Sequence, residues 1–317
     1  TLRDIRAFYR QGKPLPRKGV LLSFDHSRKS SYFSIESAIR RAGWRAVMFL
    51  WTRPIVEGDP ASLRWPYVRG MIRSGVWEAG AQSDNGFATV AAAPTGATGH
   101  VLTTLRWLPD RDRPETAAEY QARIEADHAR CRALFRRHLR LDPPAYAYPY
   151  GDFGQYSRSE LPRAVNVGLV SAHYGLGFRS GNLALNTEAS DPHCLNRLRV
   201  RPDWSGEDLV AVLDRAWPVP LPVAQDKAAE HADRWLADWG RLQPAGMRLR
   251  LESAPGTSGA KMWLLGSERY ADYTARLRDV LRRGQMGLFV RAAADENAYV
   301  YLGLGAAGEP AAEAAEK

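Results

Sequence analysis

Polar and aromatic side chains follow several short apolar runs of the chain, and these are the residues whose types could do chemistry. They are Asp25, His26, Gln82, Asp84, Asn85, Tyr148, Tyr150 and Trp204. Aromatic rings stack on the apolar CH faces of sugars, while carboxylates and amides pair with sugar hydroxyls. The set therefore fits a groove that holds a glycan without a metal. One histidine and several oxygen donors also leave open a weak site for zinc or a hard cation.

The same residues have a structural interpretation that competes with the functional one. Tyr148 could equally pack against the rim of the fold, and Trp204 is expected to be exposed in a loop. The sequence contains no HxxxH or HExxH spacing of the kind that binds zinc on a helix. We expect His128 and His138 to be solvated on an arginine-rich helix, and His173 to close a short strand.

The N-terminal part alternates apolar runs with amphipathic stretches, which indicates α/β packing. The expected strands are residues 19–24, 46–50 and 76–80, and the expected helices are residues 34–42 and 65–74. Parallel strands in such an arrangement carry functional loops at their carboxyl ends. Because Asp25 directly follows the first strand, we expect these loops to form the site.

A long insertion separates the first strands from the rest of this part. Residues 89–116 are rich in Gly, Thr, Pro and Asp and are expected to lie on the surface. A long helix over residues 117–139 follows, with one apolar side. That side carries Tyr120, Ile124, Cys131, Leu134 and Phe135. A strand end at 145–149 and a helix over 206–216 complete the pattern.

Alternating prolines at residues 218–226 predict a linker after a first domain of residues 1–217. Short strands then predict a small antiparallel β-sandwich, incomplete in length, over residues 227–305, and the tail at 306–317 is expected to be disordered. The strands expected in the sandwich are residues 247–252, 260–265, 273–280, 286–291 and 298–304.

The net charge of +9 lies wholly in the first 219 residues, because residues 220–317 hold 13 basic and 13 acidic side chains. Such a charge raises the question of nucleic acid, but zinc-finger, helix-turn-helix and RNP signatures are missing, so we expect no nucleic-acid partner. Residues 303–308 spell GxGxxG without a βαβ unit after them, which excludes a dinucleotide site.

The cysteine count, the apolar runs and the start of the chain limit which class of protein this is. Two cysteines, Cys131 and Cys194, are too few for a disulfide framework. No apolar run approaches the 18 residues of a membrane span. The chain starts at Thr1 with neither the charged nor the apolar region of a signal peptide, so we expect a processed or excised product, with any targeting signal outside the given sequence.

Three segments resemble the polysaccharide deacetylase family, also called the NodB homology domain. The segments are LSFDHS at 22–27, SGVWEAG at 74–80 and AYPYG at 147–151. They are similar to the family motifs Thr-Phe-Asp-Asp-Gly, Glu-Ile-Gly-Ser-His and Arg-x-Pro-Tyr-Gly. GKPLP at 12–16 and the 119–132 helix resemble the branch that acts on poly-N-acetylglucosamine. The resemblance implies a distorted (β/α) barrel of NodB type, and GSERYADY at 266–273 weakly resembles concanavalin-type sandwiches.

The family mechanism, carried over residue by residue, makes Asp25 the general base of a metal-assisted hydrolysis. His26 stands at the position of the metal-binding aspartate, and Gln82 stands at that of the first metal-binding histidine. The second histidine position falls on Gly86 or Phe87. The resemblance therefore implies a family framework whose metal ligands are replaced, with no cofactor expected unless zinc still binds.

We expect a glycan-binding pseudoenzyme whose partner is a polysaccharide, anionic or containing N-acetylglucosamine, outside the cytoplasm in the periplasm or cell envelope. The alternative is an active metal-dependent N- or O-deacetylase in which Asp25, His26 and Asp84 act as rearranged ligands. A third interpretation is a structural scaffold in exopolysaccharide assembly.

Overall fold

The structure is a computed structural model. It describes residues 1–16, 18–157, 159–181, 185–216, 232, 234–246, 248–253, 260–264, 286–290, 298–304 and 310–316. Contacts divide the chain into two compact units: residues 1–180 with 186–195, and residues 181–185 with 196–317. The linker expected at 218–226 lies outside the described residues, so the domain boundaries stay a prediction.

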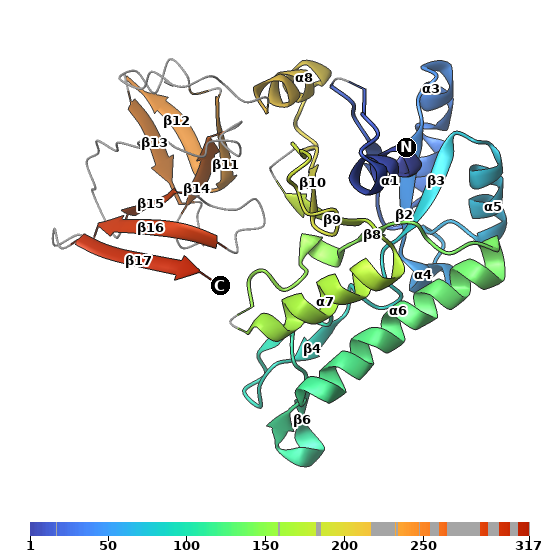
Figure 1. Cartoon of the computed structure of the whole chain (residues 1–317), viewed down its shortest axis with the longest axis horizontal. Helices are drawn as coiled ribbons and strands as arrows, with labels where there is room; N and C mark the ends of the chain where they lie inside the picture. Colours follow the sequence, from blue (N-terminus) through green and yellow to red (C-terminus); the bar gives the residue numbers. More distant parts are fainter. Residues whose placement is uncertain are drawn as a thin grey trace. The chain divides into compact units, whose positions relative to one another are not determined.

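The first unit is built on a parallel sheet flanked by helices, which confirms the α/β class (Figure 1). The sheet has the strand order β1-β2-β3-β8-β9-β10. Its strands are β1 (Leu22–Phe24), β2 (Ala46–Leu50), β3 (Trp77–Ala81), β8 (Tyr146–Ala147), β9 (Gly177–Gly181) and β10 (Leu195–Leu198). The pairs from β1 to β9 along this order are parallel. Because parallel strands end at the same edge, the segments after β1, β2, β3 and β8 meet there.

Helices cover both faces of this sheet. They are α1 (Leu2–Gln11), α2 (Lys29–Phe33), α3 (Glu36–Arg41), α4 (Thr52–Glu57), α5 (Trp65–Arg73), α6 (Ala117–Leu139) and α7 (Glu160–His173). Alternate residues of the wholly buried strand β2 point to opposite faces. Met48 packs with α5, α6 and α7, while Phe49 packs with Leu2 of α1. The sheet is therefore buried on both sides, as the continuous apolar run of β2 predicts.

The long helix α6 lies beside α7 (Figure 1). The insertion at residues 89–116 precedes α6 and packs against it. Thr116 and Glu119 form a capping box at its start, which satisfies backbone N–H groups that have no partner inside the helix. Val101 and Leu102 of the insertion pack on Tyr120 and Ile124 of α6. The insertion holds two short hairpins, β4 (Thr89–Ala91) with β5 (Thr98–His100) and β6 (Trp107–Leu108) with β7 (Arg113–Pro114).

The sequence predicts most of these elements, and the differences have physical reasons. The helix expected over residues 34–42 corresponds to the shorter α3, and a separate short helix, α2, precedes it at residues 29–33. The strand expected to close at His173 is wrong, because that residue ends helix α7. The buried residues of α7, Pro162, Asn166 and Val170, repeat at helical spacing. The elements not predicted include α1, α4, α7, β9 and β10.

The second unit contains α8 (Gly206–Arg215) and antiparallel strands. The strands are β11 (Trp235–Trp239), β12 (Arg241–Ala245), β13 (Arg248–Glu252), β14 (Lys261–Leu264), β15 (Met286–Val290), β16 (Ala298–Leu304) and β17 (Pro310–Glu316). They form the sheets β11-β14, β12-β13 and β15-β16-β17. Residues 310–316 pair with β16, and the disordered tail expected at 306–317 stays a prediction. The strand expected at 273–280 lies outside the described residues.

In the part of the chain that the structure describes, none of the helices has the length and apolar content that crossing a bilayer requires.

Candidate functional site at the carboxyl ends of the strands

The turn after β1 holds His26 and Ser27 in a strained backbone conformation. Both residues are left-handed, with φ of 67° and 55°, which costs a non-glycine residue about 1–2 kcal/mol. The surroundings hold them there: Ser27 donates to the carbonyl of Trp51 at 3.3 Å, and its own carbonyl accepts from the N–H of Leu63 at 2.7 Å. Asp25, half-buried, lies immediately before this turn. Strain maintained in this way is typical of functional sites.

Gln82 joins the turn after β1 to the loop after β3. Its side chain is 1% exposed, and Oε1 accepts the backbone N–H of His26 at 3.0 Å. The amide oxygen is therefore already used to position His26. One lone pair of this oxygen remains, but a neutral amide is a poorer ligand for zinc than an imidazole or a carboxylate.

The rest of this loop, residues 82–87, is held from helix α6 by Asp127. Its carboxylate accepts from Ser83 Oγ at 2.6 Å, from the N–H of Asp84 at 3.2 Å and from the N–H of Asn85 at 2.6 Å. We call residues 82–87 the β3 loop. Sequence reasoning missed Asp127, whose position on a helix face gave no separate signal.

The carboxylate of Asp84 is buried and ion-paired, so it is not available to bind a metal ion or a sugar. Its side chain is 1% exposed, and Oδ1 accepts from Thr52 Oγ1 at 2.8 Å. Oδ2 lies 3.2 Å from Arg53 Nη2 and 2.9 Å from Arg130 Nε. Asp84 would have to release these partners before binding a cation or a sugar hydroxyl. Asn85 is half-buried next to it.

Position 86 has no room for a side chain. A Cβ on Gly86 would lie 2.5 Å from both Pro149 Cγ and Ser83 Oγ, far inside normal contact distance. A histidine therefore does not fit there unless the neighbours move. Position 87 is more open, and Phe87 is half-buried at the surface.

Five rings from separate loops form a continuous surface that we call the aromatic row. Its members are His26, Trp51, Phe87, Tyr150 and His100. Phe87 is the centre, with ring centroids 4.6 Å from His26, 4.7 Å from Trp51 and 5.1 Å from Tyr150. Trp51 and Phe87 were not among the predicted glycan-binding residues. The position of Trp51 directly after β2 was the signal that could have found it.

The outer end of the row is fixed by hydrogen bonds. His100 stacks on Tyr150 at 4.0 Å and 9°, and its Nδ1 lies 3.0 Å from Asp152 Oδ2. Thr103 Oγ1 donates to the same oxygen at 2.8 Å. Tyr150 itself is left-handed, is 45% exposed and donates from its hydroxyl to the carbonyl of Phe87 at 2.8 Å. The rings are thus held in place while their faces stay accessible.

The other predicted aromatic residues lie elsewhere. Tyr148 is 1% exposed and donates to the carbonyl of His193 at 3.0 Å. The ring of Tyr148 packs in the hydrophobic core of the first unit, whereas Tyr150 is exposed at the surface. Trp204 is half-buried in the second unit, before α8, and its role in a glycan site stays a prediction.

The expectation that His128 is solvated is wrong. His128 lies on the inner side of α6, 1% exposed, with Nδ1 3.0 Å from the hydroxyl of Tyr174. Burial lowers the pKa of His128 to about 3, so the ring is neutral. His138 is half-buried and stacks on Trp65 at 4.5 Å. Neither histidine lies with the residues of the aromatic row.

The residues present do not fit a zinc site. Within the described ranges, no group of three or more His, Cys, Asp or Glu side chains is arranged to hold a metal ion. His26 offers an imidazole, Gln82 a committed amide oxygen, and Gly86 and Phe87 no donor side chain. Structural and catalytic zinc sites use three or four His, Cys or carboxylate ligands. No hydrolytic step through a metal is therefore derived from this arrangement.

Comparison with known proteins gives a family match for this part of the chain. Residues 12–168 match the family described as "Polysaccharide deacetylase". Residues 22–27, 74–80 and 147–151, which carry the motif resemblance, all lie inside that match. The resemblance inferred from the motifs is confirmed.

Two curated relatives match over the same part. The poly-beta-1,6-N-acetyl-D-glucosamine N-deacetylases of Escherichia coli K12 and of Escherichia coli O157:H7 are each 29% identical over 176 residues. The match covers 51% of this chain and 26% of each relative. The matched part thus spans about a quarter of the length of these relatives, and the match supports the poly-N-acetylglucosamine branch.

Solved structures share the fold. The BpsB deacetylase domain from Bordetella bronchiseptica matches with a TM-score of 0.52 and 23% identity, over 62% of this chain and 75% of that one. A de-N-acetylase from Aggregatibacter actinomycetemcomitans matches with a TM-score of 0.57 and 20% identity, over 66% and 80%. At these identities the likeness establishes the parallel-sheet α/β fold alone.

Proposed function

The chain belongs to the polysaccharide deacetylase family through residues 12–168, and from this premise we propose that it is a glycan-binding pseudoenzyme. The observation that carries the proposal is the aromatic row. It lies at the carboxyl ends of the strands, where the family resemblance places the metal. Phe87, one of the two residues that align with a metal-binding histidine, is the centre of the row.

The proposed ligand is a polysaccharide that contains N-acetylglucosamine, as the names of the relatives suggest. Sugar rings would stack on Phe87, Trp51 and Tyr150, whose apolar faces match the CH faces of pyranoses. Asp25 and His26, next to the row, would accept and donate hydrogen bonds to hydroxyl or acetamido groups. These residues bind and orient a glycan in this proposal, and they supply no activated water.

The proposal carries three further expectations. We place the protein outside the cytoplasm, in the periplasm or envelope, where such polysaccharides are modified. We also infer that the sheet of the first unit belongs to a distorted (β/α) barrel, and that the C-terminal strands belong to a sandwich. Neither inference is needed for glycan binding at the row.

The competing proposal is an active metal-dependent N- or O-deacetylase. The observation that favours it is the retention of Asp25 beside His26 in a strained turn. Under this alternative, His26 and Asp25 would be the rearranged ligands, with Asp84 as a third only after release from Arg53 and Arg130. A scaffold without ligand is the remaining possibility.

Glycan binding is tested by calorimetry with β-1,6-linked N-acetylglucosamine oligomers. We expect Tyr150→Ala and Phe87→Ala each to weaken binding about tenfold, since each removes a stacking face. Trp44→Ala is the matched control: this 61%-exposed tryptophan precedes β2, at the opposite edge of the sheet. Equal affinity in the wild type and both row variants would contradict the proposal, and no binding at all would favour the scaffold.

Elemental analysis and acetate release, with zinc or cobalt added, separate binding from catalysis. We expect less than stoichiometric metal and no turnover. Stoichiometric metal together with turnover that disappears in Asp25→Ala would establish the deacetylase instead. A His26→Asp, Gln82→His, Phe87→His variant serves as a positive control for metal analysis, because it restores three donors without placing a side chain at Gly86.

A further inference from the structure

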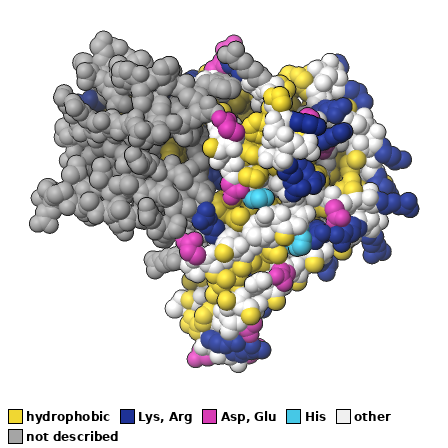
Figure 2. Space-filling model, in the orientation of Figure 1, with side chains coloured by type: hydrophobic (Ala, Val, Ile, Leu, Met, Phe, Trp, Pro, Cys, Tyr) yellow, Lys and Arg dark blue, Asp and Glu magenta, His cyan; other side chains and the backbone are white. Residues whose placement is uncertain are grey.

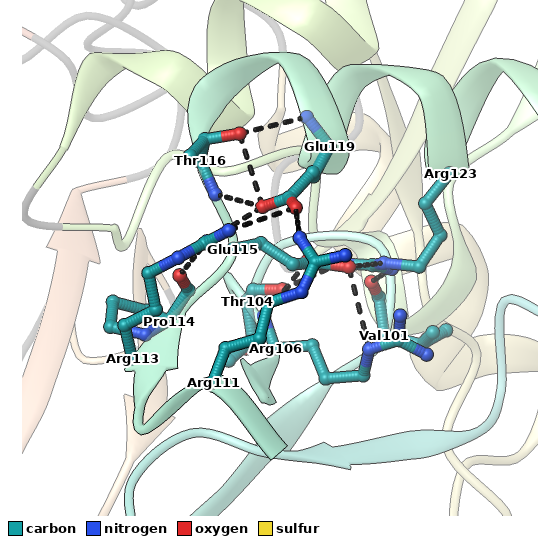
Figure 3. Close-up of polar contacts among 10 residues, drawn as sticks. All are labelled: Val101, Thr104, Arg106, Arg111, Arg113, Pro114, Glu115, Thr116, Glu119 and Arg123. Atoms are coloured by element: carbon teal, nitrogen blue, oxygen red, sulfur yellow. Dashed lines mark hydrogen bonds and ion pairs between the residues drawn. The ribbon is translucent and has the colours of Figure 1, made fainter. Parts of the chain in front are cut away.

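Around α6, carboxylates are shared by two arginines each. The groups are Asp84 with Arg53 and Arg130, Glu115 with Arg106 and Arg123, Glu119 with Arg111 and Arg113, and Asp142 with Arg132 and Arg136. Figure 3 shows the groups centred on Glu115 and Glu119. Each group has one arginine more than it has shared carboxylates, although Arg53 of the Asp84 group also pairs with Glu57 at 3.7 Å. We call these four groups the arginine band. Lys and Arg side chains also gather where α5 and the end of α6 lie (Figure 2).

Two of these groups line one cavity. It holds about 280 Å³ between α6, the β3 loop and the insertion. Its lining includes Arg53, Arg106, Arg123 and Arg130 together with Asp84 and Asp127. Both carboxylate oxygens of Asp127 accept hydrogen bonds from the β3 loop, and the carboxylate of Asp84 is shared between two guanidinium groups. The charged side chains of the lining are therefore four arginines and two aspartates, and the apolar part of the lining comes from Val90, Val101, Leu102, Ile124 and Ala126.

The arginines that line the cavity differ in how many of their N–H groups already donate a hydrogen bond. Arg123 uses four of its five N–H donors: Nε and Nη2 donate to Glu115 at 2.8 Å, and the carbonyls of Val101 and Thr104 accept from the two terminal nitrogens (Figure 3). Arg130 contacts Asp84 through Nε only and is 61% exposed. Among the described residues, its two terminal nitrogens have no protein partner.

Arg53 and Arg106 keep donors as well. Arg53 Nη2 contacts Asp84, while Nη1 lies 3.7 Å from Glu57, beyond hydrogen-bond distance. Arg106 Nε lies 3.4 Å from Glu115, and in the described part of the chain its terminal nitrogens have no hydrogen-bond partner. Three guanidinium groups thus surround one cavity with unused N–H donors, which is the arrangement that recognises carboxylate and phosphate oxygens.

We propose that this cavity is a binding site for an oxyanion of single-sugar size, a carboxylate- or phosphate-bearing sugar. The cavity volume equals that of about nine water molecules in the liquid. This is more than an inorganic oxyanion fills and is close to the volume of one sugar acid. The sugar acid is either a residue of an acidic polysaccharide or a free molecule. The site is separate from the aromatic row and does not depend on the function proposed for the row.

Calorimetry of the full chain with glucuronate and with inorganic phosphate tests the site. We expect saturable binding that weakens with salt. Arg130→Gln and Arg106→Gln should each weaken it about tenfold, since each removes charge-assisted donors. Each variant leaves the partner carboxylate one arginine, so folding is retained, which circular dichroism checks. Arg137→Gln is the control, because it makes the same change at an exposed position of α6 outside the cavity.

Absence of saturable binding for both probes would overturn the proposal. So would an equal loss in Arg137→Gln, since that result indicates diffuse charge. A uronate-containing oligosaccharide that binds at least tenfold tighter than glucuronate identifies a polysaccharide as the source, and equal affinity identifies a free sugar acid. Phe87→Ala and Tyr150→Ala should leave glucuronate binding unchanged, so failure of the aromatic row and failure of the cavity give different results.

Discussion

The β3 loop has two sides, and they differ in chemistry. On one side, Gln82 and Phe87 contact the turn after β1 and the aromatic row, where the groups are apolar rings and neutral amides. On the other side, Asp84 and Asn85 line a cavity surrounded by guanidinium groups. The two regions are separated by one layer of backbone that Asp127 holds in place.

This difference shows how a family framework can keep its geometry while its chemistry changes. The side where the resemblance places metal ligands has rings and a glycine at the ligand positions. The α6 side carries the charge, in groups of two arginines per carboxylate. These groups hold eight arginines and four shared carboxylates, so they contribute an excess of four to the net charge of +9.

The largest effect is expected from removing the support that both sides share. Asp127→Ala should lower the free energy of unfolding by about 3 kcal/mol, because three donors of the β3 loop lose a charged acceptor. Urea unfolding measures the change. Glu125→Ala on the same helix is the control, since Glu125 is exposed and accepts only from Gln121. Equal losses in the two variants would show that the β3 loop does not depend on α6.

The buried face of α6 should make stability depend on pH. Burial lowers the pKa of His128 to about 3 in the folded chain, whereas the unfolded chain takes up this proton near pH 6.5. The unfolded state then binds more protons, so stability is present above pH 6.5 and falls as the pH decreases. Between pH 6.5 and 5 the loss should be about 2 kcal/mol.

Urea unfolding at both pH values, with wild type and His128→Gln, isolates this contribution. The variant should lose less stability over this range by the same amount. His138→Gln should change the pH dependence less than His128→Gln does, because burial lowers the pKa of the half-buried His138 in the same direction but by less. An identical pH dependence in wild type and His128→Gln would show that the ring is already protonated or solvated in the folded chain.

The tight packing on the row side predicts a smaller effect. Gly86→Ala should destabilise by about 1–2 kcal/mol, because the added Cβ lies 2.5 Å from Pro149 Cγ and Ser83 Oγ. Gly70→Ala is the matched control: no atom lies within 4 Å of its added Cβ in helix α5, so it should stabilise by up to about 1 kcal/mol. Thermal melts that move in the same direction for both would contradict the packing argument.

The smallest effect is expected on the charged side. Arg130→Gln should change the free energy of unfolding by less than about 1 kcal/mol, since the guanidinium is exposed and Arg53 stays with Asp84. The change should shrink further in 1 M salt. A loss as large as that of Asp127→Ala would show that Arg130 supports the loop rather than serving a ligand.

Much of the first unit could be predicted from the sequence, because the signals are local. The apolar run of β2 and the capping box and apolar stripe of α6 fix those elements within a residue. Short elements such as α4 and β10 gave no periodic pattern of useful length. In the second unit, residues 310–316 pair with the strand that directly precedes them, β16, which an Ala/Glu-rich composition alone does not indicate.

The site was predictable in position but not in detail. The rule that loops follow parallel strands correctly places Asp25, His26 and Gln82 together. Whether Tyr148 or Tyr150 faces the surface depends on the left-handed backbone at Tyr150, which no spacing rule reveals. The pairing of Asp84 with Arg130 joins residues 46 positions apart, and only the packing of α6 against the β3 loop brings them together.

Trp51 belongs to both environments, and this has an optical consequence. Its ring packs on Phe87 in the aromatic row, while its Nε1 donates at 2.9 Å to the carbonyl of Asp84, the residue that lines the cavity. Indole emission shifts with the polarity around the ring and with the hydrogen bond at its nitrogen. A difference spectrum between wild type and Trp51→Phe would thus convert one native side chain into a fluorescent reporter, able to register occupancy on either side of the β3 loop without any added label.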